Sequence, residues 1–215
     1  MLIFIYLGID ILFLSTYCFL AVCIRRYKKK SQTIADFDNL SLKLISVRNF
    51  YVHNTIKYEY STRFCYDDID KIVRMEKKDE YTEYDLFVLG HELGHSIDSC
   101  RNRLFYRICL LFNILTWIVY IASMMFSVYY IFNKGKIVIE LDILYWFFIM
   151  VIVARLIMTW PLEKKASNYS LDILDEIGYK IKDIKVIINL AAISQCMFYA
   201  ILFLLSISVY LVVAF

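Results

Sequence analysis

The 215-residue sequence has only five glycines and one proline, so few of its residues interrupt a helix. Secondary transporters build their binding sites from helices that glycine and proline break, and the long apolar segments of this chain are unbroken. The six cysteines form no Cys-x-x-Cys or Cys-x-x-His pair, which argues against a thiolate zinc site. We expect them to be reduced residues that fill space in the packed protein.

The sequence also has little excess charge of either sign, because 24 basic and 21 acidic residues leave a net charge of only +3. No basic stripe with interleaved aromatic residues is present, so nucleic acid is not expected as a partner. Apolar residues, in contrast, are abundant: 60% of the chain is hydrophobic, against roughly 45–50% in an average soluble protein. This excess predicts an integral membrane protein.

Four apolar segments reach the length of about 20 residues that a helix needs to cross a lipid bilayer. They cover residues 2–23, 108–132, 137–160 and 191–215. The polar stretch 133–136 separates the second segment from the third, so we expect these two to form an antiparallel helical hairpin. The sequence therefore predicts one membrane domain over residues 1–215, mainly α-helical, with about four transmembrane helices.

Basic residues predict the orientation of the chain in the membrane. Five of the six residues 25–30, directly after the first apolar segment, are Arg or Lys. The positive-inside rule places this end in the cytoplasm and both chain termini outside. A cleavable signal peptide would carry its positive charge ahead of the apolar run, so we do not expect one. The cytoplasmic part would comprise residues 24–107 and 161–185 of a multi-pass protein of a bacterial cell membrane.

The polar part is expected to form a small α+β structure. Residues 31–48 are weakly amphipathic and predict a helix, whereas residues 50–75 are rich in strand-forming residues. Residues 71–75 alternate polar and apolar side chains, as a half-buried strand does. A further helix is predicted over residues 83–99, and the residues able to cap its start are Asp79 and Thr82.

The helix predicted over residues 83–99 carries the sequence His91-Glu92-Leu93-Gly94-His95, an HExxH motif. Two histidines four residues apart project from one face of a helix. Each can give a ring nitrogen to one zinc ion at about 2.0–2.1 Å. Glu92 can act as the general base that takes a proton from the attacking water. The motif predicts Zn²⁺ as cofactor, His91 and His95 as metal ligands and Glu92 as the catalytic residue.

A catalytic zinc site needs a third protein ligand and one open position for water. Glu163 is the strongest candidate, because it follows the third apolar segment at the predicted cytoplasmic boundary. Ala166 and Ser167 share its helix face, and such small side chains can pack closely against Gly94. His53, in the strand-rich part, is an alternative. Three acidic residues further along form a reserve: Asp172, Asp175 and Glu176.

Other polar and aromatic residues receive auxiliary roles. Asp98 lies one turn beyond His95 and is placed to accept a hydrogen bond from an imidazole. Tyr169 and Tyr179 are candidates for a hydrogen bond to the oxyanion of the reaction. Ionisable residues in or near the apolar segments are expected to anchor at the interface or to pair with one another: Asp10, Glu140, Asp142 and Arg155. Aromatic residues at the segment ends are assigned to the interfacial belt: Tyr106, Tyr129, Tyr130, Trp146 and Trp160.

Three stretches together resemble the YugP-type neutral zinc metallopeptidases of bacterial membranes: residues 66–74, 90–97 and 160–167. Those are short chains with a leading apolar segment, a strand that runs into an HEVGH motif, an apolar hairpin and a Pro-x-Glu-x-x-Ala-Ser element. The resemblance implies a gluzincin-like site in which Glu163 is the acidic ligand after the hairpin. Lys165 and the pair Asn168-Tyr169 depart from the pattern of that family.

The sequence thus predicts a membrane-bound zinc metalloendopeptidase with a small zincin-like part on the cytoplasmic side. Its substrates would be peptides or protein segments at the cytoplasmic membrane face, extended along residues 71–75 and paired through the main chain. Two alternatives stay open. One is a zinc-binding membrane protein that interacts with a partner without proteolysis. The other is a zinc hydrolase of a small amide or lipid-linked substrate.

Overall fold

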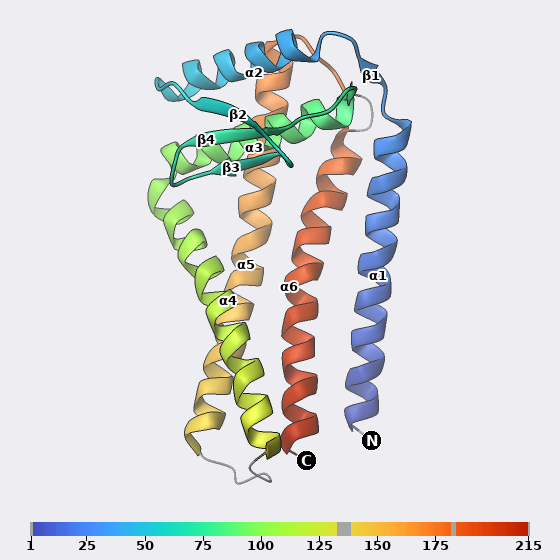
Figure 1. Ribbon diagram of the computed structural model, residues 1–215, viewed down its shortest axis with the longest axis vertical. Coiled ribbons are helices and arrows are strands. Elements are labelled where there is room, and N and C mark those ends of the chain that lie inside the picture. The colour runs from blue at the N-terminus through green and yellow to red at the C-terminus, as the bar shows by residue number, and fades with distance from the viewer. Residues whose placement is uncertain (1, 133–138, 182–183, 215) are drawn as a thin grey trace. The chain divides into compact units, whose positions relative to one another are not determined.

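The computed structural model describes residues 2–132, 139–181 and 184–214, and most of them are helical. The helices are α1 (Leu2–Lys30), α2 (Phe37–Val52), α3 (Glu83–Arg101), α4 (Arg103–Phe132), α5 (Ile139–Glu176) and α6 (Ile184–Ala214) (Figure 1). The predicted turn 133–136 lies outside the described residues, and so do the side chains of Glu140 and Asp142.

Four helices in the described part of the chain are long and apolar enough to cross a membrane: Gly8–Lys30, Arg103–Ala122, Trp146–Glu176 and Ile188–Leu205. They agree with the four predicted segments and indicate a membrane protein. The helices extend beyond the apolar residues, since α1 includes the basic stretch up to Lys30 and α5 continues past Pro161. Pro161 has no N–H, so the carbonyl of Ile157 loses its usual helical donor there.

The chain divides into two compact units. The first comprises Met1–Val22, Ile108–Trp160 and Ala192–Phe215. The second comprises Cys23–Arg107 and Pro161–Ala191, and it contains the strands, α2, α3 and the end of α5.

In the first unit, Arg155 of α5 is buried, with 7% of its surface exposed. Its guanidinium donates to the Cys109 carbonyl of α4 and to the Tyr199 hydroxyl of α6, both at 3.2 Å. The Tyr199 hydroxyl in turn donates to the side-chain oxygen of Asn113 at 3.0 Å. Arg155 therefore joins three helices, and its described hydrogen-bond partners are neutral groups rather than one of the ionisable residues with which it was predicted to pair. Asp10 is also buried in this unit.

The second unit contains a three-stranded sheet in the order β2-β4-β3. In it, β2 (Lys57–Ser61) runs parallel to β4 (Ile72–Glu76), and β3 (Cys65–Asp67) runs antiparallel to β4. The predicted strand 71–75 is thus present, one residue further on, because Lys71 has a φ of 56° and lies in the turn before β4. A separate antiparallel pair joins β1 (Thr33–Ile34) to β5 (Tyr81–Thr82).

Helix α2 begins and ends later than residues 31–48, which were predicted to be helical. Residues 50–52, predicted to be rich in strand, belong to this helix. No glycine or proline interrupts the helix before His53, whose left-handed backbone (φ 52°) ends it. The strand prediction for residues 50–52 is therefore wrong, because aromatic and β-branched residues there continue a helix that packs on the core.

Helix α3 agrees closely with the predicted range 83–99. Thr82 is its N-cap: the Thr82 hydroxyl accepts from the N–H of Asp85, and the Asp85 carboxylate accepts from the N–H of Thr82. Leu86, Leu89 and Leu93 are fully buried along one face of the helix. They pack in one core with side chains of α2, β4 and α5, among them Leu44, Val73 and Ile173. The sheet lies along α3 (Figure 1), so the motif helix is fixed by packing and capping.

Candidate metal centre

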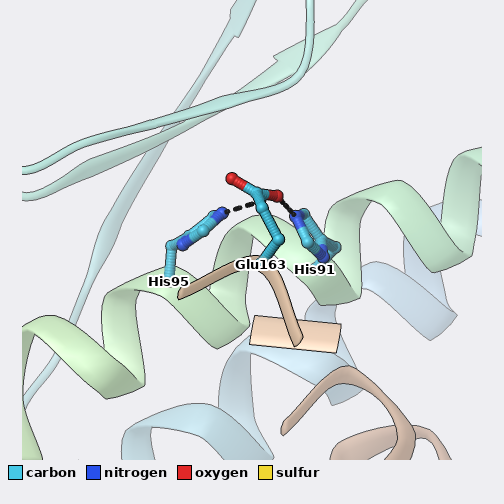
Figure 2. A group of neighbouring side chains, drawn as sticks. All are labelled: His91, His95 and Glu163. Atoms are coloured by element: carbon cyan, nitrogen blue, oxygen red, sulfur yellow. Dashed lines mark hydrogen bonds and ion pairs between the residues drawn. The ribbon is translucent and has the colours of Figure 1, made fainter. Parts of the chain in front are cut away.

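His91 and His95 lie one turn apart on α3, with ring centroids 4.7 Å apart. Glu163 of α5 reaches both rings (Figure 2). Its Oε2 atom is 3.1 Å from Nε2 of His91 and 3.8 Å from Nε2 of His95. The three side chains are only 12–16% exposed. One ligand atom from each residue lies within 4.8 Å of the others, so His91, His95 and Glu163 form a candidate metal-binding group.

Glu163 comes this near because α5 packs directly on the glycine face of α3. A Cβ atom added to Gly94 would lie 2.8 Å from the carbonyl carbon of Ala166 and would overlap its oxygen. Ala166 is fully buried, and Ser167 beside it is 1% exposed. The structure therefore shows the predicted close packing of this small-residue face against Gly94.

Replacing Gly94 with alanine is expected to destabilise the protein by about 3 kcal/mol, because overpacking here pushes on backbone atoms that cannot rotate away. In a chain of this size the loss corresponds to a fall in the melting temperature of roughly 6–12 °C, measured by circular dichroism in detergent. Gly90→Ala is the matched control: its added Cβ meets the side-chain oxygen of Ser170, which can turn. Equal melting temperatures for the two variants would show that the close approach of Ala166 does not restrict the size of the residue at position 94.

The Nδ1 atoms of His91 and His95 have different surroundings. Nδ1 of His91 lies 3.1 Å from the buried Ser167 hydroxyl, a contact that fixes the ring with Nε2 toward Glu163. Nδ1 of His95 is buried and has no hydrogen-bond partner in the described part of the chain. Burial alone would lower the pKa of His95, but the Glu163 carboxylate raises it above its usual value.

Asp98 does not have the role that its spacing predicts. Its Oδ2 atom is buried without a hydrogen-bond partner among the described residues, as is Nδ1 of His95, so the two side chains are not bonded. The other carboxylate oxygen accepts from the side-chain amide of Asn102, the C-cap residue of α3. That bond joins Asp98 to the end of the helix, and Nζ of Lys165 lies 4.0 Å from the same oxygen.

Glu92 is held by the edge of the sheet. The backbone N–H of Tyr66, in the middle of β3, donates to Oε2 of Glu92 at 2.7 Å. The Tyr66 hydroxyl lies 2.9 Å from the Ser99 hydroxyl, so β3 is joined to α3 at two points. The candidate base therefore has a defined position next to the metal-binding group.

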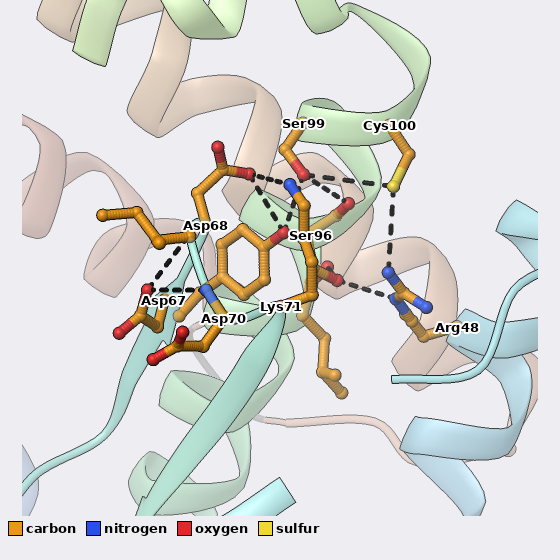
Figure 3. A network of polar contacts seen from close by, with 11 residues as sticks. Arg48, Asp67, Asp68, Asp70, Lys71, Ser96, Ser99 and Cys100 are labelled. Carbon is orange, nitrogen blue, oxygen red and sulfur yellow. Dashed lines mark hydrogen bonds and ion pairs between the residues drawn. The ribbon is translucent and has the colours of Figure 1, made fainter. Parts of the chain in front are cut away.

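A buried arginine joins the same end of α3 to α2 (Figure 3). Arg48 is 2% exposed, and its Nε donates to the Ser96 hydroxyl at 2.8 Å. Its other nitrogens bond the carbonyl of Asn54 at 2.8 Å and the sulfur of Cys100 at 3.9 Å. Burial lowers the pKa of Arg48.

All six cysteines are free, but Cys100 and Cys18 are exposed, so these two do not fill interior space as predicted.

The other candidates lie elsewhere. His53 is exposed at the end of α2, and its ring packs against Phe50 at 6.2 Å between centroids. The reserve residues Asp172, Asp175 and Glu176 are exposed, and none of them belongs to the metal-binding group. Tyr169 packs under Arg101, and the Tyr179 hydroxyl bonds Glu83 at 3.4 Å.

Tyr106, assigned from the sequence to the interfacial belt, lies beside the metal-binding group, a position that the sequence did not predict. Its ring centroid is 6.4 Å from that of His95. No local pattern marks this position, because only the turn between α3 and α4 brings Tyr106 back beside His95.

No protein-family model, curated protein or solved structure matches this chain. The donor atoms of the site themselves indicate its chemistry. Three ligands of a tetrahedral zinc ion, each about 2.0–2.1 Å from the metal, lie roughly 3.3 Å from one another. The separations of 3.1 and 3.8 Å fall on either side of that value. Two imidazole nitrogens and a carboxylate suit a first-row divalent metal.

Proposed function

We propose that this chain is a membrane-bound, zinc-dependent endopeptidase of gluzincin type, with His91, His95 and Glu163 as zinc ligands and Glu92 as general base. The convergence of Glu163 with the two histidines of the HExxH helix supports this proposal most strongly. The three residues leave a fourth position for water, as catalytic zinc sites do. The stretches that resemble YugP-type metallopeptidases include all four residues.

When bound, zinc would act as a Lewis acid that polarises the scissile carbonyl and makes water a nucleophile at neutral pH. Glu92 accepts a proton from the attacking water as the water oxygen bonds to the carbonyl carbon. It then gives that proton to the departing nitrogen as the carbon–nitrogen bond breaks, which leaves a carboxylic acid and an amine. The bond from the Tyr66 N–H keeps one oxygen of Glu92 fixed, and the other oxygen is available for the proton.

The sheet suggests where an extended substrate would lie. The predicted pairing of substrate along residues 71–75 is wrong for residues 72–74, because there β4 is already paired with β2 on one side and with β3 on the other. β3 is an edge strand, and the N–H of Tyr66 points away from β4 toward Glu92. A peptide added beside β3 would carry its scissile bond past Glu92. We propose peptides or membrane-protein segments at the cytoplasmic face as substrates, with the second unit as the zincin-like cytoplasmic part.

The proposal predicts about one tightly bound zinc ion per chain and zinc-dependent cleavage of peptides. Zinc would be measured by mass spectrometry on the detergent-purified protein, and cleavage on a mixture of unstructured peptides, before and after removal of zinc with a chelator. A folded protein without zinc, even after zinc is supplied, would contradict the metal centre. Zinc without peptide cleavage would favour one of the two alternatives, and a lipid extract as substrate would separate them.

A further inference from the structure

Tyr106 lies in the first turn of α4, just after the C-cap of α3. Its backbone N–H bonds the Asn102 carbonyl at 3.0 Å, and this turn brings its ring back toward the motif helix. The ring lies edge-on, at an interplanar angle of 63°, to both His95 and Tyr66. Tyr106 is therefore placed between a metal-binding histidine and the strand that holds Glu92.

The hydroxyl of Tyr106 makes no hydrogen bond to any residue that the structure describes. The hydroxyl of the neighbouring Tyr66, in contrast, has two hydrogen-bond partners. The Tyr66 hydroxyl is 2.9 Å from the Ser99 hydroxyl and 3.2 Å from a carboxylate oxygen of Asp68. Burial raises the pKa of the Tyr106 phenol, and the nearby carboxylates of Asp68, Glu92 and Glu163 raise it further. Tyr106 is thus a neutral hydrogen-bond donor with no acceptor, beside the base and one ligand.

Attack on a peptide carbonyl places negative charge on its oxygen, in a site whose own carboxylates repel that charge. A fixed donor that meets the oxygen only as the charge develops lowers the barrier more than it strengthens substrate binding. The ring and hydrogen-bond contacts described for Tyr169 and Tyr179 are with Arg101 and Glu83, not with the metal-binding group.

We propose that Tyr106 is a catalytic residue whose hydroxyl donates a hydrogen bond to the oxyanion formed from the scissile carbonyl. This inference rests on the proposed peptidase function. The hydroxyl keeps its proton throughout, so the proton transfers remain with Glu92.

The test is Tyr106→Phe in the full-length, zinc-loaded protein, because phenylalanine keeps the ring against His95 and removes only the hydroxyl. We expect kcat for a peptide to fall about 10²–10³-fold with KM and zinc content unchanged. The affinity for a phosphinic peptide, which mimics the tetrahedral oxyanion, should fall by a similar factor. The affinity for the peptide product should stay the same. Tyr179→Phe is the matched control, because it removes a hydroxyl that bonds Glu83 outside the site, and its kcat should change less than about threefold.

A kcat of Tyr106→Phe within about threefold of wild type would overturn the inference. Equal losses of affinity for the phosphinic peptide and for the product would also overturn it, since they indicate a packing role. Failure of the proposed function is seen separately, because wild-type protein would then bind no zinc or cleave no peptide before any variant is compared.

Discussion

Replacing Glu163 with alanine is expected to reduce bound zinc from about one ion per chain to a small fraction, with a loss of affinity above 100-fold. Glu163 is the only carboxylate in the metal-binding group of the described residues, and it faces both imidazoles. Without it, two histidines on one helix remain, and two ligands do not hold zinc against exchange with water. The measurement is zinc per chain after dialysis against a weak chelator.

Two further variants make this test specific. Asp172→Ala removes an exposed carboxylate from the same helix and should leave zinc content unchanged. Glu163→Gln keeps the size of the side chain but removes its charge, so it should also lose zinc. Circular dichroism must show that each variant remains helical. Full retention of zinc by a folded Glu163→Ala protein would rule out Glu163 as the third ligand.

The features that sequence reasoning located are those with a local cause. Long apolar runs specify helices of membrane-spanning length, and the spacing of His91 and His95 specifies one helix face. Glu163 was selected because it follows the third apolar segment and has Ala166 and Ser167 on its helix face. In each case the pattern that points to the feature lies within a short stretch of the chain.

The features that it missed depend on contacts between distant residues. The alternation in residues 71–75 indicates a strand, but it does not say that β4 is the central one. Tyr66 reaches Glu92 through its backbone N–H, so its side-chain type carries no information about that bond. Asp98 has the right spacing from His95, yet Asn102 competes for its carboxylate at the helix end. Register and competition of this kind are set only when the chain folds.

Replacing Glu92 with glutamine is expected to lower peptide hydrolysis by about 10²–10⁴-fold, the usual contribution of a general acid–base residue. Glutamine can still accept the hydrogen bond from the Tyr66 N–H through its side-chain oxygen, so the position of β3 should be kept. It cannot take the proton of the attacking water. Zinc content should not change, because Glu92 is outside the metal-binding group. The measurements are kcat/KM for a defined peptide and zinc per chain.

Glu83→Gln supplies the control on the same helix, since Glu83 lies in the first turn of α3 and contacts Tyr179. Near-wild-type activity is expected for it. Loss of activity with zinc retained in Glu92→Gln, beside loss of both in Glu163→Ala, would separate the residue that moves the proton from the residue that holds the metal. If Glu92→Gln cleaved peptides as fast as wild type, the general base would have to be another group, and the hydrogen bond from Tyr66 would be purely structural.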